Sequence, residues 1–163
     1  MNKARVAIST LSLSAMAFVG ILAREDYTSN AIIPTKGDVP TVGFGTTSGV
    51  HMGDTTTPVR AVQRALADSQ QFEGALKRCV TAPLHQAEYD VYLDLAYNIG
   101  TTNFCRSSIP AKLNAGQYVA ACNTILEFKY AAGFDCSTPG NRRCAGVWAD
   151  RLNKHAQCMG AQT

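Results

Sequence analysis

The hydrophobic and polar positions divide the chain into three parts with different patterns. Residues 6–23 carry no charge, and this run ends at the charged residues 24–26. Residues 30–54 instead mix short apolar runs with Gly, Pro and Thr, which is typical of strands and turns. From Thr57 onward, apolar residues recur every three or four positions, as in amphipathic helices. The pattern predicts a mainly helical domain with a small β element near its start.

The β element is expected to be a hairpin, because two β-type runs, 31–33 and 41–44, flank the turn-forming residues 34–38. Thr57 before Pro58 is a good helix start, since threonine caps the first turn and proline fits the first helical position. We expect helices over residues 58–78, 84–100, 108–116, 117–130 and 146–158. The predicted fold class is therefore α+β, mainly α.

Composition limits the chain to one domain and excludes several classes of protein. Its 163 residues are 46% hydrophobic and 17% charged, a balance that excludes a disordered tail or a highly charged coiled coil. The formal net charge of +3 suits attraction to an anionic polymer or surface. This charge density is too low for a nucleic-acid-binding protein, so we expect no nucleic-acid partner.

The six cysteines favour disulfides and an oxidising compartment, because their number is even and no Cys-x-x-Cys pair is present. Six cysteines allow fifteen pairings, and proximity suggests that Cys136 and Cys144 close a polar loop. The three histidines have no metal-ligand spacing, and no zinc motif or Gly-x-Ser-x-Gly motif occurs. We therefore expect no metal and no cofactor, and a metal-dependent amidase is disfavoured.

The uncharged segment 6–23 allows three interpretations: a signal peptide cleaved after Ala23, a permanent anchor, or a signal-anchor-release segment. Half of its residues are Ala, Gly, Ser or Thr. Each small residue in place of a bulky one forgoes roughly 0.3–0.6 kcal/mol of membrane-insertion energy, so the segment could enter a membrane and later leave it. The positive-inside rule places Lys3 and Arg5 in the cytoplasm and the rest of the chain outside the inner membrane. We favour the signal-anchor-release interpretation.

Several short motifs follow one another in an order that resembles the phage-type lysozymes of glycoside hydrolase family 24. Glu25 directly follows a predicted helix, and the predicted hairpin ends in Thr-Val-Gly-Phe-Gly at residues 41–45. The matching pieces farther along are Tyr97-Asn98-Ile99-Gly100, Ser107-Ser108, residues 112–116, and a last helix with Gly146, Arg151 and Cys158. Together the pieces cover nearly the whole chain after residue 24.

The resemblance implies a lysozyme-like fold, with a small N-terminal β-hairpin lobe and a larger helical lobe. It also implies a monomeric enzyme that cuts the β-1,4 bond between N-acetylmuramic acid and N-acetylglucosamine in peptidoglycan, as an endolysin that lyses the host cell. For the remaining cysteines it favours the pairs Cys79–Cys105 and Cys122–Cys158. The alternatives that stay open are a lytic transglycosylase and a non-catalytic peptidoglycan-binding protein.

The resemblance also assigns roles to residues of the site. Glu25 would be the general acid, Thr41 would position the attacking water, and Asn98 would line the substrate cleft, with a hydrogen-bonded polar residue of a buried helix as the alternative for Asn98. Phe44 is a candidate substrate contact, with a hairpin-core residue as the alternative. The chain departs from the family pattern at the second carboxylate, because the position nine residues after Glu25 is a proline. Asp38 is the candidate for that displaced role, and the alternative is a turn aspartate that bonds its own backbone. Threonine also replaces the usual histidine at position 46.

The position of Glu25 bears on the fate of the N-terminal segment. In the family, a helix precedes the catalytic glutamate, and cleavage after Ala23 would leave Glu25 as the second residue without that helix. We therefore divide the chain into residues 1–24, a signal-anchor-release segment that becomes the first helix, and residues 25–163, the catalytic domain. The expected location is the host inner membrane facing the periplasm, through transient insertion of residues 6–23, followed by release into the periplasm.

Overall fold

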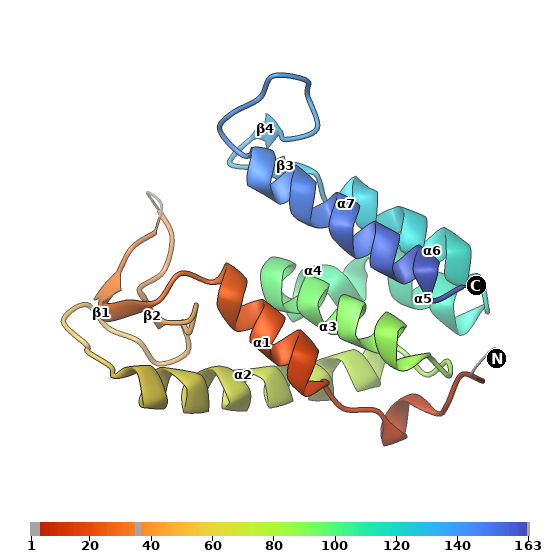
Figure 1. Ribbon diagram of the computed structural model, residues 1–163, viewed down its shortest axis with the longest axis horizontal. Helices are drawn as coiled ribbons and strands as arrows, with labels where there is room; N and C mark the ends of the chain where they lie inside the picture. The colour runs from red at the N-terminus through yellow and green to blue at the C-terminus, as the bar shows by residue number, and fades with distance from the viewer. Residues whose placement is uncertain (1–3, 35–36, 163) are drawn as a thin grey trace. The chain divides into compact units, whose positions relative to one another are not determined.

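The computed structural model describes residues 4–34 and 37–162, which form a mainly helical α+β protein, so the expected fold class is confirmed (Figure 1). The chain divides into two compact units, Leu13–Gly74 and Met1–Ser12 with Ala75–Thr163. The hairpin belongs to the first unit, and most of the helices belong to the second.

The unit Leu13–Gly74 contains a helix, a hairpin and the first part of a long helix. Helix α1 (Ala15–Arg24) begins where the Ser14 side chain accepts a hydrogen bond from Ala17 N, and Ile21 is its buried residue. Strands β1 (Thr28–Ile32) and β2 (Thr41–Gly43) pair antiparallel, and residues 54–56 pair with the other edge of β1. Helix α2 (Pro58–Cys79) starts at the predicted proline and continues into the second unit.

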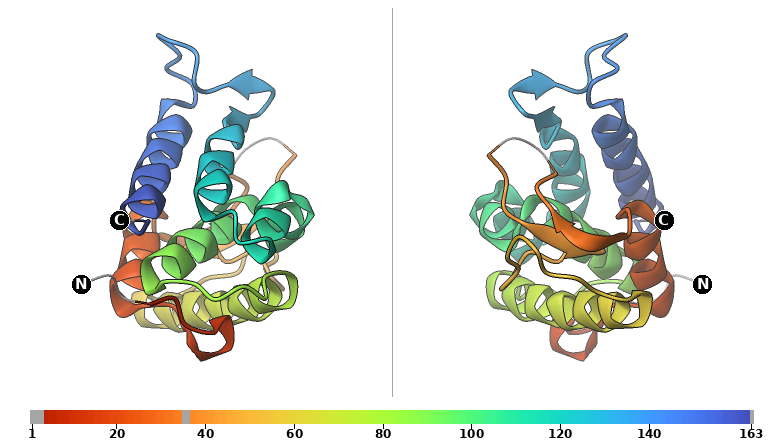
Figure 2. Two further views of the ribbon diagram at one scale, coloured as in Figure 1. Left: turned by 90° about the vertical axis from the view of Figure 1, so that its right-hand side faces the viewer. Right: turned by 90° about the vertical axis from the view of Figure 1, so that its left-hand side faces the viewer.

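The second unit is built around helix α3 (Gln86–Ile99), on which Tyr89, Tyr92, Leu93 and Leu95 are fully buried. The C-terminal helix α7 (Ala145–Gly160) runs beside α6 (Tyr118–Thr124), and a disulfide between Cys122 and Cys158 joins them (Figure 2). This unit also contains η1 (Ile8–Thr10), α4 (Thr101–Arg106), α5 (Ser108–Asn114), η2 (Ile125–Glu127), β3 (Tyr130–Ala131) and β4 (Phe134–Asp135).

Two helices differ from the sequence-based expectation. Helix α4 was not predicted, and the expected helix 117–130 ends earlier, as α6 followed by the short 3-10 helix η2. After η2 the chain forms the small β3–β4 hairpin, whose turn residues Ala132 and Gly133 both have positive φ. This hairpin and the loop that follows it project beyond the ends of α6 and α7 (Figure 2).

The N-terminal segment is only partly helical. Residues 4–14 consist of extended chain around the one-turn 3-10 helix η1 (Ile8–Thr10), and the α-helix begins at Ala15. The physical reason lies in Ser14, whose side chain caps the helix and thereby favours a start at the next residue. Among residues 4–34 and 37–162, no helix is both long and apolar enough to cross a membrane.

All six cysteines are paired, and the three expected pairings are confirmed: Cys79–Cys105, Cys122–Cys158 and Cys136–Cys144. The first two bridges join segments that lie 26 and 36 residues apart in the sequence, and the third closes a loop of 8 residues. All three bridges lie within the second unit.

Candidate active site

Glu25 stands at the point where α1 ends and the chain enters the hairpin. Its backbone N–H donates a hydrogen bond to Ile21 O at 3.1 Å, which makes it the C-terminal cap of the helix. The Glu25 side chain is half-buried, and Ile21, one turn earlier, is 2% exposed. Burial of Ile21 therefore fixes the end of α1 and, through it, the position of the glutamate.

The tight turn after β2 leaves room for the Glu25 carboxyl group. Val42 and Thr46 exchange two backbone hydrogen bonds, of 3.0 and 3.2 Å, and so close a loop over residues 43–45. Gly45 has a φ of +79°, and a Cβ at this position would lie only 3.0 Å from Glu25 Oε2. The second glycine of the Gly-Phe-Gly sequence therefore serves both the turn and the close approach of the carboxyl group.

Thr46 connects the same turn to α2. Its side chain is 2% exposed, and its hydroxyl donates to Asp68 Oδ2 at 2.7 Å. The residue that replaces the usual histidine thus bonds a carboxylate on α2. Asp68 was not singled out from the sequence, because nothing in the local pattern distinguishes it from a solvated residue on the polar face of a helix.

Thr41 and Asp38 lie on the chain that leads into this turn. Thr41 begins β2, pairs with Ile32 and donates its hydroxyl to Val39 O at 3.2 Å. Asp38 is exposed, and its Oδ1 accepts a hydrogen bond of 2.9 Å from Val39 N. The side chain thus bonds the backbone of the next residue, which is compatible with the alternative role of Asp38 as a turn aspartate that bonds its own backbone.

Phe44, at the tip of the turn, is half-buried and packs on an aromatic neighbour. Its ring centroid lies 5.3 Å from that of Tyr27, whose hydroxyl donates to Thr56 O at 3.2 Å. A half-buried ring that packs on a second ring is compatible with either a hairpin-core role or a substrate-contact role for Phe44.

Asn98 belongs to the other unit, where it lies near the end of α3 on the edge of a cavity of about 690 Å³. The cavity is lined by residues of α3, α4, α5 and α7 and the segment between α6 and β3, among them Ser107, Ser108 and Arg151. Arg151 is 3% exposed and donates from Nη2 to Asn98 Oδ1 and from Nε to Phe128 O, the latter at 3.0 Å. Burial lowers the pKa of Arg151, and neighbouring Asp150 opposes that shift.

The contact with Arg151 fixes the orientation of the Asn98 amide. A guanidinium group only donates hydrogen bonds, so the atom that faces it must be the amide oxygen. The amide nitrogen, with its two N–H donors, is then left for other partners. Among the described residues, no group of three or more His, Cys, Asp or Glu side chains could hold a metal ion.

Comparison with known proteins places the chain in a family. The family model described as phage lysozyme matches residues 24–146. The SAR-endolysin of Pseudomonas phage phiKMV is 33% identical over 112 residues, which are 68% of each chain. The endolysin of Salmonella phage P22 is 34% identical over 98 residues, 57% of this chain and 67% of that protein.

The fold agrees with the sequence match. The crystal structure of a P22 lysozyme mutant superimposes with a TM-score of 0.73 at 26% identity, over 92% of this chain and 99% of that chain. The family model covers Glu25 at the end of α1, the hairpin that follows it, and helix α3, which carries Asn98. The chain therefore belongs to the phage lysozyme family and is a lysozyme-type peptidoglycan hydrolase.

Proposed function

We propose that the chain is a muramidase, which hydrolyses the β-1,4 bond between N-acetylmuramic acid and N-acetylglucosamine with Glu25 as the general acid. The observation that carries this proposal is the place of Glu25, at the end of α1 and against the backbone of Gly45. The reaction requires a protonated carboxyl group to donate to the leaving oxygen, and partial removal of a carboxyl from water favours that form. The half-buried place of Glu25, at a helix end and beside a tight turn, supports the proposed role.

Thr41 and Asp38 are the candidates for the second role, the positioning of water and the stabilisation of the positive charge that develops on the sugar. Thr41 precedes the Gly43–Gly45 turn in the same strand and offers a hydroxyl group, which can hold a water molecule. Asp38 offers a carboxylate, although one of its oxygens already accepts from Val39 N. If Asp38 only supports the turn, Thr41 positions the attacking water alone.

Lytic activity of single variants on chloroform-treated Gram-negative cells tests these roles. We expect Glu25→Gln to lose about 10²–10⁴-fold in rate, the usual contribution of a general acid. Asp26→Asn removes a neighbouring exposed carboxylate and serves as the matched control. A Glu25→Gln enzyme that lyses cells as fast as the control would refute the proposed acid.

Substitutions at two further positions test the second role. Asp38→Asn keeps an oxygen that can accept from Val39 N and removes only the charge, so a loss of activity would mark the charge as catalytic. Thr41→Ala removes the hydroxyl and Thr41→Ser restores it. If Thr41 positions the water, the alanine variant loses most of its activity and the serine variant keeps much of it.

The products separate the muramidase from the alternatives. A lytic transglycosylase releases 1,6-anhydro muropeptides, which are lighter than hydrolysis products by the mass of one water molecule. Mass spectrometry of the released muropeptides therefore distinguishes the two reactions. A folded wild-type protein that binds peptidoglycan without releasing any muropeptide would instead favour the non-catalytic binding protein.

In the second unit (Met1–Ser12 with Ala75–Thr163), called the helical unit below, we propose that Asn98 binds substrate through its amide nitrogen, because its amide oxygen accepts from Arg151. Asn98 would then recognise an acceptor on the substrate, such as a carbonyl oxygen. Asn98→Asp keeps an oxygen for Arg151 but removes both N–H donors. We expect this variant to raise KM and to leave the folded structure stable, whereas unchanged KM would exclude the contact. Phe44 is the proposed apolar contact on the hairpin.

We also propose that residues 6–23 first anchor the enzyme in the host inner membrane and later leave the lipid, so that active enzyme works in the periplasm. Support comes from the uncharged run in the sequence and from the similarity to SAR-endolysins, those of Pseudomonas phage phiKMV and Escherichia phage Mu. Cleavage after Ala23 would remove nearly all of α1, including buried Ile21. N-terminal sequencing of periplasmic enzyme tests this, and an active chain that starts at Arg24 would refute it.

A further inference from the structure

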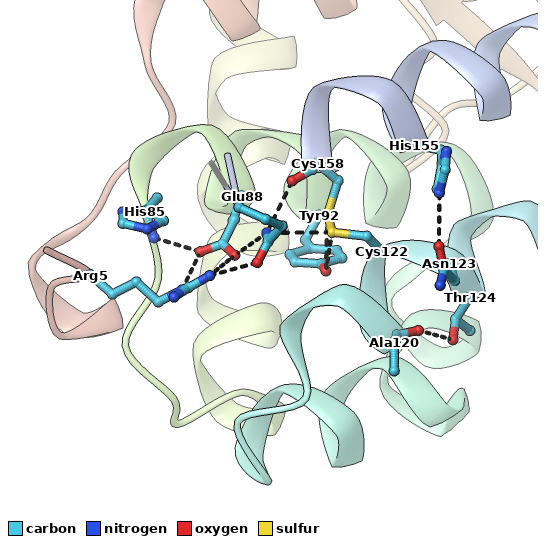
Figure 3. The surroundings of a disulfide bond; sticks show 11 residues. Arg5, His85, Glu88, Tyr92, Ala120, Cys122, Asn123, Thr124, His155 and Cys158 are labelled. Atoms are coloured by element: carbon cyan, nitrogen blue, oxygen red, sulfur yellow. Dashed lines mark hydrogen bonds and ion pairs between the residues drawn. A yellow bond between two sulfur atoms is a disulfide. The ribbon is translucent and has the colours of Figure 1, made fainter. Parts of the chain in front are cut away.

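Glu88 is a buried carboxylate in the first turn of α3, outside the candidate active site. It is 0% exposed, and four hydrogen bonds reach its two oxygens (Figure 3). Two of the donors are Arg5 Nε and Nη2, at 3.0 and 2.9 Å. The other two are Gln162 Nε2 at 2.7 Å and the backbone N–H of His85 at 2.8 Å. Arg5 therefore supplies half of these hydrogen bonds and a full positive charge.

Arg5 also contacts Gln162 and Tyr118, so its guanidinium group is fixed by more than the bond to Glu88. Its Nη2 also donates to Gln162 Oε1 at 2.7 Å, and its guanidinium carbon lies 3.6 Å from the centroid of the Tyr118 ring. The hydrogen bond to Glu88 raises the pKa of Arg5. The bidentate pair and the stacked ring use the planar shape of the guanidinium group, which a lysine cannot reproduce.

The residues that follow Arg5 continue this docking within the same unit. Val6 and Leu84 exchange two backbone hydrogen bonds, of 3.0 and 2.9 Å, and Ile8 and Leu11 are 6% and 7% exposed. Lys77 Nζ donates to Leu11 O at 2.6 Å. The segment 5–12 is thus an integral part of the helical unit, and Arg5 is its first anchoring contact in the described chain.

The proposed membrane tether gives this contact a consequence for regulation. While residues 6–23 lie in the lipid, the positive-inside rule keeps Arg5 on the cytoplasmic side, and Glu88 folds on the periplasmic side. Glu88 then lacks two of its hydrogen bonds and the charge of Arg5. A buried charge without its partner is strongly unfavourable. Arg5 crosses the hydrocarbon once during release, and a return would add the loss of its pairing with Glu88 to the cost of a second crossing.

We propose that Arg5 and Glu88 form an ion pair only after release, and that this pair stabilises the unit Met1–Ser12 with Ala75–Thr163 and opposes the return of residues 6–23 to the membrane. We call this pair the latch. This inference rests on the proposed tether of residues 6–23. It assigns to Arg5 two successive roles, as a topology signal in the cytoplasm and as the partner of Glu88 in the released enzyme.

The test compares Arg5→Met, Glu88→Gln and the double variant with wild type, each expressed as the full chain. Lys3→Gln is the matched control, because it removes one positive charge from the same end of the chain and keeps Arg5. Membrane and periplasmic fractions are separated before and after the membrane potential is dissipated, and the released enzyme is melted and exposed to protease.

We expect Arg5→Met to lower the melting temperature of the released enzyme by roughly 10 °C and to make its N-terminal segment protease-sensitive. Its share in the membrane fraction after dissipation should rise several-fold over that of Lys3→Gln. The double variant should regain part of the lost melting temperature, because without the carboxylate no buried charge is left unpaired.

The two proposals fail in different ways. A wild-type enzyme that never sediments with membranes refutes the tether. A tethered wild type whose release and melting are matched by Arg5→Met refutes the latch alone. The latch is also refuted if the double variant melts no higher than Arg5→Met.

Discussion

The contact between Gly45 and Glu25 leads to a sharp prediction for the substitution Gly45→Ala. A methyl group at position 45 would lie 3.0 Å from Glu25 Oε2 and 3.4 Å from its Cδ, so the carboxyl group would have to move by a few tenths of an ångström. The φ of +79° adds backbone strain, because residues with a Cβ are disfavoured in this region. The substitution therefore perturbs both stability and the position of the proposed acid.

The two effects differ in size and in the measurement that detects them. The backbone strain should cost about 1–2 kcal/mol of unfolding free energy. A displacement of about 1 Å in a catalytic group can cost about 10²-fold in rate, so a shift of a few tenths of an ångström should cost roughly 10-fold. Gly49→Ala separates the two, because Gly49 has a φ of +66° and nothing within 4 Å of the added Cβ.

The assay is the initial rate of turbidity loss of chloroform-treated cells, measured well below the melting temperature of each variant. Thermal melting of the same samples gives the folded fraction. We expect both variants to melt below wild type by similar amounts, and only Gly45→Ala to lose activity per folded molecule. Equal activity of the two variants at the same folded fraction would refute the role of Gly45 in placing Glu25.

Three further predictions concern stability. Replacing Cys122 and Cys158 by alanine should cost about 4 kcal/mol, the chain-entropy value for a loop of 36 residues, and a smaller loss by chemical denaturation would contradict this account. Lys154→Met should cost about 3–5 kcal/mol, because Lys154 is 2% exposed and its cation pairs with Asp94 and Asp150, of which Asp150 keeps Arg151 as a second partner; an unchanged melting curve would exclude this. The hydrogen bond from Lys129, assisted by Ser137, lowers the pKa of Asp135 to about 2, so the β3–β4 hairpin should keep this contact above about pH 4 and lose it as the pH falls toward 2. An NMR titration of the Asp135 carboxyl carbon checks the last prediction, and a midpoint near 4 would contradict it.

The bounds of most helices could be predicted from the local sequence pattern. Helix α2 starts at the predicted Pro58, and α3 and α7 lie within two residues of their expected bounds, because apolar period and capping residues are local properties of the chain. The pattern failed where a turn interrupts a periodic stretch, as at Ala132 and Gly133. It also failed for residues 6–14, which were expected to belong to the first helix. These residues are mostly extended chain, and Val6 among them pairs with Leu84.

The sequence by itself determined the fold class, the family, the pairing of the nearby cysteines Cys136 and Cys144, and Glu25 as the candidate acid. The fold class follows from composition and periodicity, and proximity suggests the cysteine pair. The family and the role of Glu25 are what the resemblance of the ordered motifs to the phage-type lysozymes implies. Only the tertiary structure decided that Gly45 makes room for Glu25, that Asp68 holds Thr46, and that Arg5 neutralises a carboxylate 83 residues away. Such contacts join residues from distant parts of the chain, and their energy depends on burial and geometry that exist only after folding.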